Sequence, residues 1–164
     1  MKKSVFPLLF LLLLYNAFVY SEEVVAKNTI SVGESIVWIG SPVGFLPGLN
    51  IEYERLLSNN FALAVDVGVD ALILLYADTY ARWYPWAGKF FTNLGFGIWR
   101  YNFNTWNFTP VISPGIGWKI DIGEPNGWNL ITGIIGRVFF YEDDRNNFTV
   151  DITTKIIFRV GYSF

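Results

Sequence analysis

The chain of 164 residues contains no cysteine and no histidine. Without cysteine it can form no disulfide and has no thiolate nucleophile or thiolate metal ligand. Without histidine it lacks the general base of serine and cysteine hydrolases and the imidazole ligand found in most zinc sites. These absences exclude the commonest hydrolytic and zinc chemistries, and we expect no enzymatic activity, no cofactor and no metal site.

An excess of charge of either sign is also missing. Twelve Lys and Arg residues stand against fourteen Asp and Glu residues, a net charge of −2. Because nucleic-acid binding depends on a surplus of cations that neutralise phosphates, no nucleic-acid partner is expected. Apolar residues are abundant instead, at 52% of the chain, and aromatic residues reach 19%, a composition that favours interfaces.

Only one long apolar run is present, and it lies near the amino terminus. Met1-Lys2-Lys3 is basic, Val5 to Leu14 is apolar, and Val19-Tyr20-Ser21 has small or β-branched residues at the positions that precede a cleavage site. The run is about half of the roughly 20 residues that a spanning helix requires. The pattern therefore predicts a cleaved signal peptide over residues 1–21 and one exported domain over residues 22–164. Any membrane would then be crossed by strands.

The domain divides into eight segments of alternating apolar and polar residues, separated by turn residues. The alternation is clearest over Phe61 to Ala71, Val111 to Ile122 and Val150 to Phe164. It is poorest over Thr29 to Ile39, where Glu34 interrupts the apolar face, and we expect a bulge or register change there. Short turns alternate with longer connections. The pattern predicts an all-β fold, an eight-stranded antiparallel up-and-down barrel.

The two faces of these segments differ in a way that predicts which one points inward. One face is bulky and nearly uncharged, whereas the other is rich in glycine and carries charges of both signs. Small residues suit a crowded interior, so the apolar face is expected to point outward. The predicted lumen charge network consists of Glu52, Glu54, Asp66, Asp70, Asp78, Arg82, Lys119, Asp121, Arg137, Asp151, Lys155 and Arg159.

This network has two interpretations, an ion pathway or a packed core of salt bridges. Eight strands enclose only enough room for side chains, and a buried charge without a partner is costly. The packed core is therefore favoured. Aromatic residues near the segment ends predict two interfacial girdles: Trp83, Tyr84, Trp86, Trp99, Tyr101, Trp128, Phe139, Phe140, Tyr141, Tyr162 and Phe164.

In the last eleven residues every second residue from Ile156 onward is apolar or aromatic, and the stretch ends on an aromatic residue, with Tyr162 and Phe164 on the apolar face. In this ending, in the signal peptide and in the dyad repeat, the chain resembles the small outer-membrane β-barrel superfamily, closest to eight-stranded barrels of the OmpA/OmpX type. The resemblance implies that Tyr162 and Phe164 form a barrel-assembly signal. It also implies a Gram-negative-type outer membrane, with its lipid and lipopolysaccharide-type leaflet and the barrel-assembly machinery as partners.

The rim segments offer candidate contacts at Phe45, Leu46, Phe103, Trp106 and Phe108. These residues either grip an unidentified surface ligand or rest on lipid headgroups. We expect a structural or surface-interaction barrel. The alternatives are a narrow channel for small solutes and a secreted, soluble, lipocalin-like binding barrel, in which the apolar face would point inward.

Overall fold

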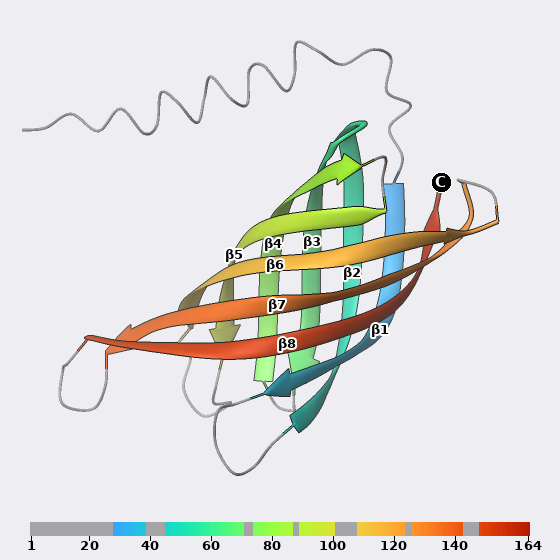
Figure 1. Cartoon of the computed structure of the whole chain (residues 1–164). Helices are drawn as coiled ribbons and strands as arrows, with labels where there is room; N and C mark the ends of the chain where they lie inside the picture. Colours follow the sequence, from blue (N-terminus) through green and yellow to red (C-terminus); the bar gives the residue numbers. More distant parts are fainter. Residues whose placement is uncertain are drawn as a thin grey trace, which may run out of the picture.

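A computed structural model describes residues 28–38, 45–70, 74–86, 89–100, 108–123, 126–142 and 148–164. These ranges hold eight strands in one closed antiparallel barrel, in which each strand pairs with its neighbour in sequence and β8 returns to β1 (Figure 1). The strands are β1 (Asn28–Trp38), β2 (Phe45–Ser58), β3 (Phe61–Asp70), β4 (Leu74–Trp86), β5 (Phe90–Arg100), β6 (Thr109–Ile122), β7 (Trp128–Glu142) and β8 (Phe148–Ser163). The predicted fold class and strand count are confirmed.

Within the described ranges, no helix is long and apolar enough to cross a bilayer.

The barrel closes through the final strand. The register of β1 with β8 runs from Thr29 opposite Ser163 to Trp38 opposite Thr154. Beyond it, the backbone N–H of Asn28 donates to the carbonyl of Phe164 at 2.8 Å, and the N–H of Phe164 donates to the carbonyl of Asn28 at 2.9 Å. The aromatic carboxy-terminal residue is therefore part of the seam that removes both sheet edges.

The bulge expected at Glu34 is absent, so that prediction is wrong. Pairing of β1 with both β2 and β8 continues without a shift through Glu34, which lies opposite Leu49 and Phe158. Glu34 keeps its outward place, because no extra residue shifts the alternation of inward and outward side chains along the strand. We call this alternation the parity of the strand. The register shifts in the barrel lie instead between Leu56 and Ser58 and between Trp83 and Trp86, next to short turns.

The sidedness of the barrel is the one that the alternation predicts. On β3 the outward residues Leu63, Val65 and Val67 are 44–47% exposed, whereas Ala62, Ala64 and Asp66 between them are buried. The same division holds along β8, where Phe158 and Val160 are exposed and Lys155 and Arg159 are buried. The barrel therefore has an apolar exterior and a polar interior.

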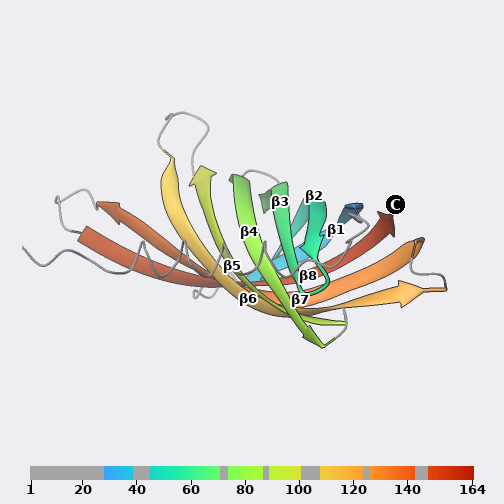
Figure 2. The ribbon, with the colours of Figure 1, turned by 90° about the horizontal axis from the view of Figure 1, so that it is seen from above.

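The barrel has two walls, one formed by β1 to β4 and the other by β6 to β8, and their strands cross steeply (Figure 1). Figure 1 shows β1 to β4 running across the direction of β6, β7 and β8, and Figure 2 shows the elongated outline from above. Close approach between neighbours needs glycine at several inward positions. A Cβ added at Gly97 would lie 1.9 Å from Asp78 Oδ1, and one at Gly33 would lie 2.0 Å from the Phe158 carbonyl oxygen. The glycines thus make room for the charged side chains beside them.

The residues predicted for the aromatic girdles divide between the two faces of the barrel. Trp83, Trp128, Tyr141, Tyr162 and Phe164 are exposed, and Phe140 is half-buried. Three other members of the predicted set, Tyr84, Trp99 and Phe139, are buried in the lumen. These three share the inward parity of their strands, and parity overrides closeness to a strand end. Tyr101 and the side chain of Trp86 lie outside the described residues.

Candidate functional site: the charged lumen

The lumen is filled by charged side chains that project from opposite walls of the barrel. The carboxylates come from neighbouring strands β2, β3 and β4, and four of the five cations come from β6, β7 and β8. Five acidic and five basic residues form the ion pairs of the network: Glu52, Glu54, Asp66, Asp70 and Asp78 with Arg82, Lys119, Arg137, Lys155 and Arg159. Their formal charges cancel.

One cluster is centred on Arg82 of β4. Its Nη2 lies 2.5 Å from Glu52 Oε2, and its Nη1 lies 2.7 Å from Glu52 Oε1 and 2.8 Å from Glu54 Oε2. The guanidinium also stacks over the ring of Phe91, 4.6 Å from its centroid. Arg82 therefore makes the two-pronged contact with a carboxylate that only arginine allows, and does so in full burial.

Glu54 is held by two further donors from other strands. The hydroxyl of Tyr84 donates to Glu54 Oε2 at 2.5 Å, and Lys119 Nζ donates to Glu54 Oε1 at 2.7 Å. Lys119 also donates to Thr29 Oγ1 at 2.7 Å, and 13% of its side chain is exposed. Both oxygens of this carboxylate thus accept hydrogen bonds from other members of the network.

Arg159 joins this cluster to the second one. Its Nη1 lies 2.5 Å from Glu52 Oε2 and its Nη2 lies 2.5 Å from Asp66 Oδ2, while its Nε donates to the side-chain oxygen of Asn50. Lys155 continues the chain from Asp66 to Asp70, with its Nζ 3.7 Å from each carboxylate. The two clusters are therefore one continuous network.

The second cluster is centred on Arg137 of β7. Its Nη1 lies 2.5 Å from Asp70 Oδ2 and its Nη2 lies 3.0 Å from Asp78 Oδ2. The hydroxyl of Ser35 donates to Asp70, and the hydroxyl of Tyr80 donates to Asp78. Arg137 thus ties β3 and β4 to the opposite wall.

Two of the twelve predicted network residues do not belong to it, and for them the prediction is wrong. Asp121 and Asp151 have the inward parity of their strands, but both are exposed near a strand end. Asp151 accepts a hydrogen bond from the exposed Tyr141 hydroxyl at 2.5 Å. Strand parity predicts whether a side chain points into the barrel, but it does not predict how far that side chain lies from the rim. At the rim, an inward side chain is exposed to solvent. Without Asp121 and Asp151, the network contains equal numbers of acidic and basic residues.

Several uncharged members of the network were not singled out from the sequence as site residues. Thr29, Ser35, Asn50 and Tyr84 all bond to its charged groups. The signal that could have found them is parity, since each occupies an inward position on the same strand face as a charged residue or glycine.

The predicted rim contacts fall into three groups. Phe45 and Leu46 are not loop residues, because β2 begins at Phe45 and pairs it with Trp38. Phe45 is strongly exposed and Leu46 is half-buried, and Phe108 is exposed immediately before β6. Phe103 and Trp106 lie outside the described residues.

The lumen arrangement supports rigid cross-linking rather than acid–base chemistry. Glu52 and Glu54, the two network carboxylates closest in sequence, share Arg82 as a partner. Among the described residues no group of three or more His, Cys, Asp or Glu side chains could hold a metal ion. Each cation bridges two or more strands, so the network fastens the two walls to each other.

No protein-family model matches the sequence, and no curated protein matches it. Solved structures do match. A structure described as "De novo design of transmembrane beta-barrels" aligns with 88% of this chain and 99% of its own, at a TM-score of 0.51 and 11% identity. This match shows the fold: the chain resembles eight-stranded transmembrane β-barrels.

Two structures of the Yersinia pestis outer membrane protein Ail were also found. One is in a phospholipid bilayer nanodisc and the other is in complex with the heparin analogue sucrose octasulfate. Each aligns with 85% of this chain and 99% of its own, at a TM-score of 0.46 and 12% identity.

Proposed function

We propose that this chain is an integral barrel of a Gram-negative-type outer membrane that acts through its structure or its rim and not through its lumen. The observation that carries the proposal is the contrast between its two faces. The exterior exposes branched aliphatic and aromatic side chains along every strand, as a lipid-facing band requires. The interior is closed by a neutral network of ion pairs.

The soluble lipocalin-like alternative is opposed by the same contrast. A soluble barrel exposes polar side chains to water and encloses an apolar cavity. Here Val32, Ile51 and Phe96 are more than half exposed, whereas Arg82, Arg137 and Arg159 are buried. This arrangement fits a barrel whose exterior is surrounded by lipid. We also propose that residues 1–21 are removed as a signal peptide during export.

Membrane fractionation combined with heat-modifiability on a gel tests this location. A folded barrel in detergent is expected in the membrane fraction and to migrate differently before and after boiling. Recovery of the protein as a soluble species with unchanged migration would refute the proposal.

We expect the reconstituted barrel not to conduct ions at a steady level. Eight strands leave a lumen that side chains fill, and here the bulky Arg82, Arg137, Arg159 and Tyr80 occupy it. Single-channel recording in a planar bilayer measures this directly. Steady conductance whose ion selectivity changes in Arg137→Ala, with the unfolding midpoint unchanged, would favour the narrow channel instead.

We further propose that Tyr162 and Phe164 serve as the barrel-assembly signal. Deleting Phe164 removes both of its backbone hydrogen bonds with Asn28, so the folded fraction is expected to fall in cells and after refolding into vesicles. Phe164→Ala keeps the backbone and removes only the aromatic ring. It is expected to refold normally in vesicles but to reduce the folded, membrane-inserted fraction in cells, because the assembly machinery recognises the ring.

The measurement is the heat-modifiable fraction in both settings, with Phe158→Ala, an exposed aromatic on the same strand, as the control. Equal insertion of Phe164→Ala and the unaltered chain in cells would refute the assembly signal.

A further inference from the structure

The exterior of the barrel carries one charge where none is expected. Glu34 is exposed on the outward face of β1, between Val32 and Ile36 on its own strand and opposite Leu49 and Phe158 on the neighbouring strands. The other exposed charged side chains of the described strands and turns lie near the rims: Arg55, Lys89, Asp121 and Asp151. Glu34 thus interrupts an otherwise uncharged band of the described strands.

Glu34 lies midway between the two aromatic girdles. On β1, Ile30 pairs with Tyr53 and Tyr162 near one rim, and Trp38 pairs with Phe45 near the other. Glu34 is four residues from Ile30 and four from Trp38, which corresponds to about 13 Å along the strand in each direction. Its two methylenes cannot carry the carboxylate to either interface, unlike the longer side chains of lysine and arginine. An ionisable group at this depth is a candidate functional site.

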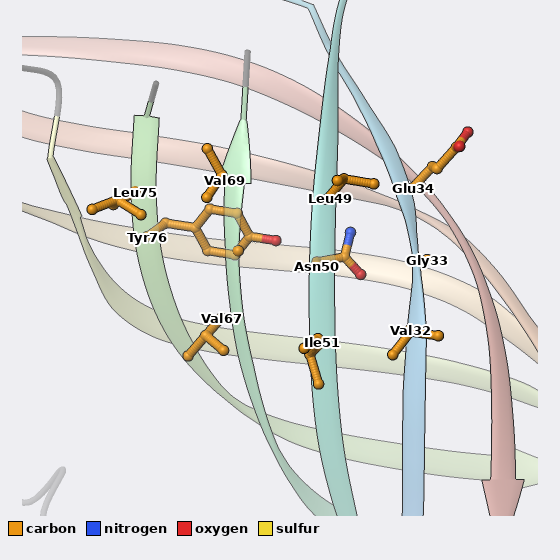
Figure 3. Close-up of a pocket in the computed structure, with 11 residues that line it drawn as sticks. Val32, Gly33, Glu34, Leu49, Asn50, Ile51, Val67, Val69, Leu75 and Tyr76 are labelled. Atoms are coloured by element: carbon orange, nitrogen blue, oxygen red, sulfur yellow. The ribbon is translucent and has the colours of Figure 1, made fainter. Parts of the chain in front are cut away.

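No partner for this carboxylate is found in the described part of the barrel. The ion pairs there all belong to the lumen, and no hydrogen bond is found to the Glu34 side chain. In Figure 3 the carboxylate extends from β1 on the side away from β2. A carboxylate held in this way among apolar side chains is complementary to a cation brought from outside the chain.

A hollow in the same wall lies beside Glu34. It has a volume of about 720 Å³ and extends over β1, β2, β3 and β4 (Figure 3). Apolar side chains form most of its lining: Val32, Leu49, Ile51, Val67, Val69 and Leu75. Gly33 and Gly68 also line it. The wall therefore offers a recess for bulky apolar groups next to a single anionic one.

We infer that this hollow and Glu34 form a docking surface for a membrane-spanning segment of another protein that carries a lysine or arginine at mid-depth. The inference rests on the membrane location proposed above. The depth of Glu34 selects this occupant, because headgroup amines stay at the interfaces, whereas a cation within a spanning segment is carried to the centre with its chain.

A second copy of this chain fits less well. The outward base on the same wall, Arg55, pairs with Asn28 at the rim and lies six residues along β2 from Leu49, the cross-strand neighbour of Glu34. Two parallel barrels packed through this wall would bring no cation to Glu34.

Energy transfer to a synthetic spanning helix tests the inference. Because the chain has no cysteine, Asn59→Cys in an exposed turn places one donor dye on the barrel in phosphatidylcholine vesicles. The probes are an acceptor-labelled polyleucine helix with one central lysine and the same helix with leucine there. We expect the lysine helix to bind roughly tenfold more tightly, as one ion pair in lipid allows.

Variants assign this preference to Glu34. Glu34→Gln and Glu34→Leu are expected to abolish it, whereas Asp121→Asn, which removes an exposed rim carboxylate, keeps it. Equal binding of the two helices, or a preference that survives Glu34→Gln, would overturn the inference. Loss of the preference on adding hexadecylammonium would assign the site to a lipid amine instead. Energy transfer between barrels that Glu34→Gln abolishes would assign it to a second copy.

The membrane location is checked separately in the same vesicles. Quenching of the native tryptophans by brominated phosphatidylcholine, together with heat-modifiability, reports insertion. A barrel that is inserted and quenched but shows no lysine preference refutes the docking surface alone, whereas a barrel that is neither inserted nor quenched refutes the proposed location.

Discussion

Replacing Arg82 with alanine is expected to lower the free energy of unfolding by about 3–5 kcal/mol. Arg82 is fully buried and binds Glu52 through two nitrogens and Glu54 through one. The substitution leaves two buried carboxylates without their arginine partner and opens a cavity beside Phe91. The loss is measured as a shift in the urea unfolding curve of the barrel in lipid vesicles, followed by tryptophan fluorescence.

The matched control is Arg55→Ala. Arg55 is exposed near a strand end of β2, so its loss is expected to change stability by no more than about 0.5 kcal/mol. Similar small effects at both positions would show that water reaches Arg82 and that the network does not hold the walls together. Arg82→Lys is expected to fall between the two, since an ammonium keeps the charge without the two-pronged geometry.

An arginine placed at Val67 is expected to destabilise the barrel by about 2–4 kcal/mol. Val67 is 46% exposed on the outer wall and lies opposite Ile51 and Ala77, inside the apolar face of β3. Hydrocarbon does not solvate a guanidinium, so the substitution places a charge against lipid. The same unfolding measurement in vesicles determines the change.

Ile122→Arg serves as the comparison for Val67→Arg. Ile122 is also outward and 52% exposed, but it is the last residue of β6. Its replacement is expected to change stability by about 0–1 kcal/mol, because the side chain reaches the interface. Equal effects of the two substitutions would show that the surroundings of the exterior do not change with depth. The proposed membrane location would then be wrong.

Parity was the part of this structure that the sequence could predict. The period of two placed Asp66, Arg82 and Arg159 inward and Leu63 and Phe158 outward, because a strand has no other way to arrange alternate side chains. The strand count followed from the turn residues between these segments. Neither inference needed any knowledge of which strands face each other across the barrel.

Depth and partnership could not be predicted in the same way. Asp121 and Asp151 share the parity of Lys119 and Arg159, and only their height separates the exposed pair from the network. The pairing of Arg137 with Asp70 and Asp78 depends on how the two walls cross, and the alternation within a strand carries no information about that crossing.

The distribution of lumen charge between the two halves of the chain has a consequence for how the barrel forms. Of the ten network residues, β1 to β4 contribute five carboxylates and one guanidinium, whereas β5 to β8 contribute four cations and no carboxylate. A half-barrel of β1 to β4 would hold five carboxylates against a single guanidinium, that of Arg82, and one of β5 to β8 would hold four cations without a carboxylate. Folding should therefore be cooperative, with no stable intermediate at β4, and attraction between the oppositely charged halves should draw the last strands into place.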